Sequence, residues 1–152
     1  MASWAEFAAA EPALASRVEE RFAIRKHKTL ATLRKDGSPR ISGIEVEFAN
    51  GELFLGMMPD SLKLRDLERD PRLALHGPTE DAPEGHPKGW AGEAKVAGVA
   101  VDVDAPASPG AGARRFRVDI SEAVFVHLND EGDQLIVESW HPGTGVRRIE
   151  RS

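Results

Sequence analysis

The chain has 152 residues, of which 41% are hydrophobic and 30% are charged. This length fits one domain with a sizeable core, and the composition excludes a disordered chain. The sequence contains no cysteine, which excludes disulfides, thiolate metal ligands and cysteine nucleophiles. Its net charge of −5 argues against a nucleic-acid partner, because non-specific binding to nucleic acid needs a positive surface.

The sequence also carries no membrane or export signal that we recognise. No stretch approaches the ~20 apolar residues that a membrane helix needs, so no membrane partner is expected. The alanine-rich start carries Glu6 and Glu11 and lacks a basic beginning, which differs from a signal peptide. We therefore expect a cytoplasmic protein. Residues 1–152 contain no repeat, low-complexity tract or linker and are predicted to form one domain.

Residues 1–26 are predicted to form a helical segment that packs on the rest of the domain. Pro12 suits the first turn of a helix. Apolar residues then recur at every fourth position and form one stripe: Leu14, Val18 and Phe22. Trp4 and Phe7 indicate a short preceding turn of helix.

From His27 onward the hydrophobic pattern alternates, which predicts β-strands. Three strands joined by Asp-Gly and Asn-Gly turns are expected to form an antiparallel meander: residues 27–34, 39–48 and 52–57. In the second of them Ile41 is out of phase with the apolar residues that follow it, so a bulge is predicted at Gly43. A short helix is then expected to begin at Asp60, its predicted N-cap, and to end before Pro71.

Further strands are expected in the second half of the chain: residues 72–76, 90–103, 116–128 and 134–140. Gly98 marks a phase shift within the second of these. Two segments rich in proline and glycine are predicted to be loops, residues 77–89 and 104–113. Six or seven short antiparallel strands, with one helix between the third and the fourth, are typical of a small β-barrel. The expected fold class is therefore mainly β with flanking helices.

The motifs of several common catalytic sites are absent from the sequence, namely HExxH, GxSxG, the P-loop and GxGxxG, and no catalytic residue is assigned. His76 and His86 flank an acidic loop, but histidines at such places are more often solvated or hydrogen-bonded than metal-bound, so no metal is expected. Glu45 and Glu47 share one face of a strand. We interpret them as the solvent side of an amphipathic strand rather than as an acid–base pair.

One region of the sequence favours the binding of an anion. Arg40 offers a planar guanidinium fork on the second strand. Ser61 and Lys63 lie at the start of the predicted helix, where free backbone N–H groups and the positive end of the helix dipole favour an anion. Arg65 is close by. The alternative is that these cations are solvated, with Arg65 and Arg69 paired to neighbouring carboxylates.

Residues 37–75, GSPRISGIEVEFANGELFLGMMPDSLKLRDLERDPRLAL, combine these features in a definite order. An Arg-bearing strand, an Asn-Gly turn, a further strand, a Ser-x-Lys helix start and Asp-Pro-Arg follow one another. Together with its surroundings over residues 29–140, this order resembles the pyridoxamine 5′-phosphate oxidase-like family of flavin-binding split barrels. That family includes FMN enzymes and reductases that use the deazaflavin coenzyme F420. The resemblance implies a six- to seven-stranded antiparallel split β-barrel that forms a homodimer, with the cofactor held between protomers.

The resemblance also implies a set of cofactor-binding residues. On the second strand these are a phosphate-binding arginine and the two residues after it: Arg40, Ile41 and Ser42. On the third strand, backbone groups along the isoalloxazine would come from Phe54, Leu55, Gly56 and Met57. At the helix start the phosphate would meet Ser61, Lys63 and Arg65. The partner chain would contribute Glu93 and Lys95.

Two departures from the family pattern shape the functional hypotheses. Glu45 stands where the oxidase itself carries a lysine, and Leu55-Gly56 stand where it has Tyr-Thr, which disfavours vitamin B6 oxidation. The favoured hypothesis is an FMN-binding oxidoreductase that transfers hydride to or from a small molecule. The alternatives are an F420-dependent reductase and a non-enzymatic protein that holds a flavin, a deazaflavin or haem. Trp90 is the tryptophan best placed to stack on an isoalloxazine, although core or interface packing is favoured for all three tryptophans.

Overall fold

The computed structural model of the chain describes residues 1–103 and 114–152, so the loop predicted over residues 104–113 lies outside the described residues. Helices and strands follow one another in this order: α1 (Trp4–Ala10), α2 (Pro12–Ala23), β1 (Lys28–Leu33), β2 (Pro39–Ile44), β3 (Val46–Ala49), β4 (Glu52–Met57), α3 (Leu62–Arg69), β5 (Arg72–His76), a 3-10 turn (Pro87–Gly89), β6 (Glu93–Val103), β7 (Arg114–Leu128), β8 (Leu135–His141) and β9 (Gly145–Arg151). The expectation of a mainly β protein with flanking helices is confirmed.

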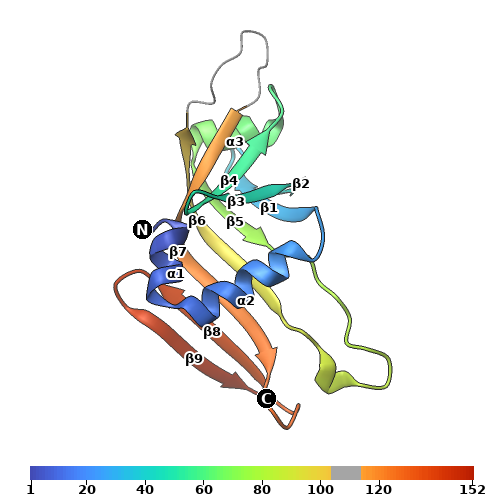
Figure 1. Ribbon diagram of the computed structural model, residues 1–152. Helices are drawn as coiled ribbons and strands as arrows, with labels where there is room; N and C mark the ends of the chain where they lie inside the picture. Colours follow the sequence, from blue (N-terminus) through green and yellow to red (C-terminus); the bar gives the residue numbers. More distant parts are fainter. Residues whose placement is uncertain (104–113) are drawn as a thin grey trace.

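The strands form one antiparallel sheet that curls into a split barrel (Figure 1). Their spatial order is β2-β1-β5-β6-β7-β4-β3. The strands at the two ends of this order, β2 and β3, are separated along the chain by Glu45 alone, so the chain itself joins the two ends of the sheet. The 15-residue strand β7 pairs with β4 near its start and with β8 near its end, and β8 and β9 thereby extend the sheet beyond the barrel.

The predicted three-stranded meander is wrong in its second strand. Residues 39–48 form two strands, because β2 pairs with β1 whereas β3 pairs with β4. The break falls at Glu45, at the corner of the barrel, and not at Gly43, which pairs regularly with Thr29. The phase change between Ile41 and the later apolar residues thus marks a change of partner strand rather than a bulge.

The end of the chain contains a strand that the sequence pattern did not indicate. Residues 145–151 form β9, which pairs with β8 along its whole length. All seven residues of β9 are at least partly exposed, so the strand lacks the buried alternation by which strands are recognised. With this strand and the division at Glu45, the described sheet has nine strands instead of six or seven.

The predicted phase shift at Gly98 is confirmed, because the pairing of β6 with β7 changes register between Ala97 and Gly98. A side chain at Gly98 has no room. Its Cβ would lie 2.1 Å from the backbone carbonyl oxygen of Asp119 on β7. The glycine therefore allows two strand backbones to approach closely at the bulge.

Replacing Gly98 with alanine is accordingly expected to lower the free energy of unfolding by about 2–3 kcal/mol, because a backbone must shift to relieve the overlap. Urea denaturation measures the loss. Gly43→Ala is the matched control, since a Cβ there meets nothing within 4 Å, and its effect is expected to stay within about 0.5 kcal/mol. An equal loss in both variants would contradict the close approach at Gly98.

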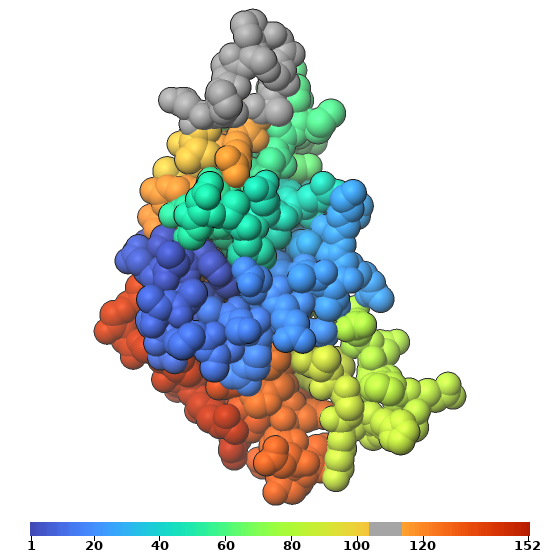
Figure 2. Space-filling model, viewed as in Figure 1, coloured from blue at the N-terminus to red at the C-terminus, as the bar shows by residue number. Residues whose placement is uncertain are grey.

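The N-terminal segment folds into two helices that lie across one face of the barrel, as predicted (Figures 1 and 2). Ser3 and Glu6 form a capping box at the start of α1, with Ser3 Oγ accepting from the Glu6 N–H at 3.0 Å. The expected stripe on α2 is buried: Leu14, Val18 and Phe22. Trp4 and Trp140 are buried in the same core, which confirms core packing for two of the three tryptophans. Within residues 1–103 and 114–152, none of the helices combines the length and apolar character needed to cross a membrane.

Candidate functional site

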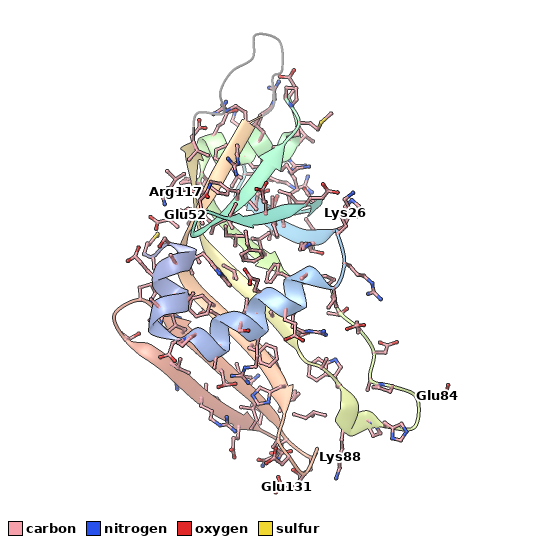
Figure 3. The ribbon with its side chains drawn as sticks, in the orientation of Figure 1. Lys26, Glu52, Glu84, Lys88, Arg117 and Glu131 are labelled. Atoms are coloured by element: carbon pink, nitrogen blue, oxygen red, sulfur yellow. The ribbon has the colours of Figure 1, made fainter. Side chains whose placement is uncertain are left out.

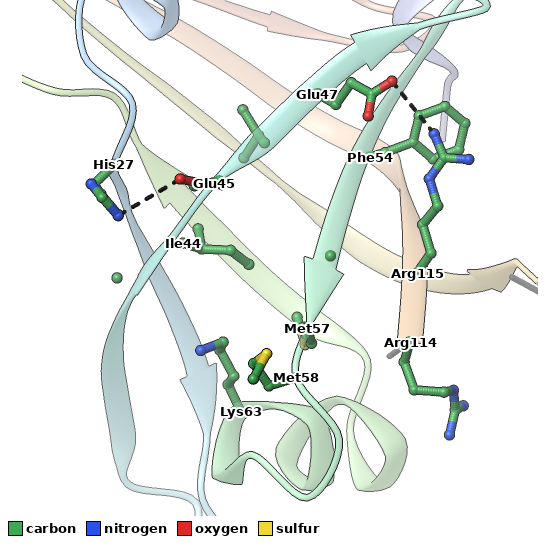
Figure 4. Close-up of a pocket in the computed structure, with 13 residues that line it drawn as sticks. His27, Ile44, Glu45, Glu47, Phe54, Met57, Met58, Lys63, Arg114 and Arg115 are labelled. Atoms are coloured by element: carbon green, nitrogen blue, oxygen red, sulfur yellow. Dashed lines mark ion pairs between the residues drawn. The ribbon is translucent and has the colours of Figure 1, made fainter. Parts of the chain in front are cut away.

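A hollow of about 830 Å³ opens where the β2–β3 corner, β4, the start of α3 and the start of β7 meet (Figure 4). We call it the first hollow, and it is lined by His27, Gly43, Ile44, Glu45, Val46, Glu47, Phe54, Gly56, Met57, Met58, Lys63, Arg114 and Arg115. It therefore joins the Gly-Met end of β4 to the lysine at the beginning of α3. Both of these were predicted to hold a cofactor.

The floor of the first hollow follows from the alternation of side chains along β4. Leu55 and Met57 point into the barrel core and are almost fully buried. Phe54 and Gly56 therefore lie on the other face, and a Cβ added to Gly56 would meet nothing within 4 Å. The backbone of β4 is thus bare over a short stretch beside Phe54, and a flat ring has room to lie against it.

The charges around the first hollow fall into two groups. Glu45 pairs with Lys26 at 3.7 Å and with His27 at 3.9 Å, and Arg114 pairs with Glu68 and Asp102 outside the hollow. Lys63, in contrast, makes neither an ion pair nor a hydrogen bond with any described residue. Figure 4 shows its side chain beside Met58 at the edge of the hollow. The first hollow is thus lined by a half-buried lysine whose ammonium donors have no partner among the described residues.

The helix beside Lys63 begins one residue later than predicted. Ser61, and not Asp60, is the N-cap: Ser61 Oγ accepts from the Leu64 N–H at 3.3 Å. Asp60 instead takes a left-handed backbone conformation with φ of 62°, at the turn that leads from β4 into the helix. The hydroxyl of Ser61 is partly used by the helix itself, while its proton remains free to donate. Free backbone N–H groups at this end of α3 favour an anion.

A second hollow of about 640 Å³ lies on the other side of α3. Its lining is mostly basic: Arg34, Lys35, Asp36, Arg40, Leu62, Arg65, Asp66 and Arg69. The arginine predicted to bind phosphate, Arg40, faces this second hollow rather than the first. Arg65 also lines it and pairs with Asp60 at 3.6 Å. Two neighbouring basic regions thus flank the start of α3.

Arg40 is held in place by a buried carboxylate. Asp66 is 2% exposed and accepts three hydrogen bonds, from Thr32 Oγ1 and Arg40 Nε at 2.7 Å each and from Arg69 Nη2 at 2.9 Å. Burial acts to raise the pKa of Asp66, but the hydrogen bonds from Arg40, Thr32 and Arg69 outweigh it and lower the pKa below its usual value. Arg40 donates its Nε–H to Asp66, and its two terminal nitrogens make no hydrogen bond with the described residues.

The structure brings some of the predicted residues together and separates others. Gly56, Met57 and Lys63 line the first hollow, and Arg40 and Arg65 line the second. The remaining predicted residues line neither hollow: Ile41, Ser42, Leu55, Ser61, Glu93 and Lys95. Of these, Ile41 is largely exposed, Leu55 lies in the core and Ser61 caps α3 between the two hollows. Glu93 and Lys95 lie on β6, where the Glu93 carboxylate is 3.5 Å from His76.

Several lining residues were not predicted from the sequence, among them Glu47, Met58, Arg114 and Arg115. Glu45 and Glu47 are exposed, as expected for a solvent face, but both border the first hollow. The two arginines open β7, directly after the undescribed residues 104–113, where no pattern in the sequence relates them to β4. Only the pairing of Gly56 with Arg115 across the sheet brings them to the site.

The loop predicted over residues 77–89 lies at the end of the molecule opposite α3, as the labelled Glu84 and Lys88 show (Figure 3). It contains the short 3-10 turn, and Trp90 after it donates its indole N–H to the carbonyl oxygen of Glu80 at 3.1 Å. In the described part of the chain no group of three or more histidine, aspartate or glutamate side chains is arranged to hold a metal ion.

Solved structures share this fold, although no protein-family model matches the sequence and no curated protein matches it significantly. An FMN-binding protein related to pyridoxamine 5′-phosphate oxidase, from Nostoc punctiforme PCC 73102, is 10% identical with a TM-score of 0.66, over 93% of this chain and 96% of that one. PhzG from Burkholderia lata 383, in complex with tetrahydrophenazine-1-carboxylic acid, is 12% identical with a TM-score of 0.66, over 95% and 91%. An F420 reductase is 17% identical with a TM-score of 0.51, over 67% and 91%. The expected split-barrel fold is thereby confirmed.

Proposed function

We propose that this split barrel binds FMN and is an oxidoreductase, with the isoalloxazine over Gly56 and the phosphate at the start of α3. The observation that carries the proposal is the first hollow itself: a bare stretch of β4 backbone leads directly to Lys63, whose ammonium group has no partner among the described residues. FMN when bound supplies hydride chemistry. The chain's own part is to hold the phosphate, orient the ring and exclude water.

The phosphate site that we propose uses residues from both sides of α3. Lys63 approaches from the first hollow and the terminal nitrogens of Arg40 from the second, while Ser61 and the first N–H groups of the helix lie between them. Charge-assisted hydrogen bonds of this kind are about twice as strong as neutral ones. The proposal also includes a homodimer, in which residues from a partner chain cover the open side of the first hollow.

An F420-dependent reductase is the second candidate, and one observation favours it. The second hollow continues the basic surface beyond the phosphate site with Arg34, Lys35, Arg65 and Arg69. A cofactor tail with more negative charges than a single phosphate would find additional cations there. The F420 reductase among the solved structures of this fold gives the candidate a precedent. A protein that only stores such a cofactor differs from both enzymes in lacking turnover with the reduced cofactor.

The test is a parallel titration of the purified apoprotein with FMN, riboflavin and F420, followed by cofactor fluorescence. We expect saturable FMN binding at one molecule per protomer and weaker binding of riboflavin, which lacks the phosphate. Lys63→Gln is expected to weaken FMN binding roughly tenfold, because a charge-assisted hydrogen bond is lost, and to leave riboflavin binding unchanged. Tighter binding of F420 than of FMN would support the second candidate, and binding of neither at tens of micromolar would overturn both.

Two further variants distinguish a specific loss of the site for the isoalloxazine ring from a general loss of folded structure. Gly56→Val is expected to abolish FMN binding without lowering Tm, because the new side chain meets no protein atom within 4 Å of its Cβ but occupies the place of the ring. Lys88→Gln removes an exposed lysine at the opposite end of the molecule and is expected to change nothing (Figure 3). Arg40→Ala is less suitable, because it also removes a hydrogen bond from the buried Asp66.

A further inference from the structure

Arg115 occupies an unusual position in the first hollow. Its guanidinium carbon lies 3.6 Å from the centre of the Phe54 ring, and Phe54 as a residue is only 9% exposed. The residue directly opposite Arg115 on β4 is Gly56, so no side chain separates the arginine from its diagonal neighbour Phe54. Figure 4 shows Arg115 extending along the sheet to Phe54, whereas Arg114 points to the other side.

Stacking uses the face of a guanidinium group and leaves its N–H edges free. Arg115 makes no side-chain hydrogen bond with the described residues. Its ion pair with Glu47 has an N···O distance of 3.8 Å, which is too long for a hydrogen bond, and the Glu47 side chain is 67% exposed. Stacking on Phe54 thus orders the arginine, while its donors remain available at the wall of the hollow.

The surroundings of Arg115 determine what kind of ligand fits there. The hollow between Arg115 and Lys63 is also lined by apolar side chains from the β2–β3 corner and the end of β4, namely Ile44, Val46 and Met58. A flat apolar molecule with an anionic group at its edge would meet these side chains with its ring and the guanidinium group with its charge. Carboxylates and phosphates suit the planar fork of an arginine.

We propose that Arg115 binds the anionic group, a carboxylate or a phosphate, of a flat apolar substrate in the first hollow. This inference rests on the proposed function, because it places the substrate beside a cofactor ring that lies over Gly56. Arg115 is then a specificity-determining residue, held by Phe54 in the orientation that the anion requires. Glu47 competes with the substrate for Arg115, so removing its charge strengthens anion binding.

The experiment titrates the FMN-loaded protein with benzoate, phenyl phosphate and the neutral benzamide at constant ionic strength, and follows the flavin absorbance. We expect the better of the two anions to bind roughly tenfold more tightly than benzamide. Whichever anion binds more tightly identifies the anionic group. Equal binding of all three probes would overturn the proposal. The same titration of the apoprotein, followed by amide NMR shifts, tests Arg115 even if FMN does not bind, so the two proposals fail separately.

Three variants assign the effect to Arg115. Arg115→Gln is expected to abolish the preference for the anion over benzamide, and Glu47→Gln is expected to increase it about threefold. Arg117→Gln is the matched control, because Arg117 lies two residues further along the same strand face, pairs with Asp119 at 3.9 Å and does not line the hollow (Figure 3). Loss of the preference in Arg117→Gln as well, or its persistence in Arg115→Gln, would refute the role of Arg115.

Discussion

Replacing Asp66 with alanine is expected to lower the free energy of unfolding by about 3 kcal/mol, the low end of the cost of removing one partner from a buried ion pair. The carboxylate holds Arg40 and Arg69 and accepts a hydrogen bond from the buried hydroxyl of Thr32. Without it the Thr32 hydroxyl has lost its acceptor, and the Arg40 side chain, 17% exposed, has lost its counter-charge. Arg69 is 36% exposed and remains solvated in the variant, so the expected loss of unfolding free energy stays at the low end of the range for buried ion pairs.

Urea denaturation of wild type and Asp66→Ala measures this cost. Glu68→Ala is the control on the same helix, because its ion pair with Arg114 joins two partly exposed side chains and contributes about 0–1 kcal/mol. If the two variants lose the same stability, Asp66 does not attach Arg40 and Thr32 to α3 in the way described. The Asp66 variant is also expected to bind FMN more weakly, since Arg40 then no longer has a fixed orientation.

The stabilising effect of Asp66 depends on pH in a defined direction. The pKa of Asp66 is lowered in the folded protein, so its contribution is fully present above the unfolded value of about 3.9 and is lost as the pH falls through the lower folded pKa. The difference in unfolding free energy between wild type and Asp66→Asn is therefore expected to be constant at neutral pH and to shrink below about pH 4. A difference that grows on acidification would contradict the lowered pKa.

The sequence supported the prediction of the elements whose partners are close along the chain. The hairpins at the Asp-Gly and Asn-Gly turns, the two N-terminal helices and the register shift at Gly98 were all indicated by local patterns. The division at Glu45 was not, because it depends on which strand pairs with residues 39–44 and which with residues 46–49. Strand β9 was missed because its residues are exposed and carry no alternating burial.

The candidate site shows the same limit. Ser61, Lys63 and Gly56 were predicted from short local motifs, together with the resemblance of residues 37–75 to a known family. Arg115 forms the wall opposite Gly56. It belongs to β7, which is far from β4 along the chain, and only the pairing of these two strands brings it to the site. The attachment of Arg40 to Asp66 likewise depends on how α3 packs against β1 and β2. Site residues that come from elements far apart along the chain could therefore be identified only from the structure.

Replacing Phe7 with alanine is expected to lower the free energy of unfolding by about 3–5 kcal/mol, the usual cost of removing a buried aromatic side chain. Phe7 is fully buried between α1 and the sheet, with its ring 5.1 Å from Trp4 and 4.7 Å from Trp140. These contacts attach the N-terminal helices to β8, which belongs to the extension of the sheet and not to the barrel. The substitution thus leaves a large cavity at the junction of two parts of the fold.

Thermal and urea unfolding of Phe7→Ala, followed by tryptophan fluorescence, measure this cost, because Trp4 and Trp140 both contact the deleted ring. Ile41→Ala is the control, since it also removes apolar atoms but from a side chain that is 75% exposed, and its effect is expected to stay within about 0.5 kcal/mol. FMN binding is expected to survive in Phe7→Ala below its unfolding transition, because Phe7 lines neither hollow. Loss of binding while the protein is still folded would instead mean that the N-terminal helices act on the site through β4, which contacts α1.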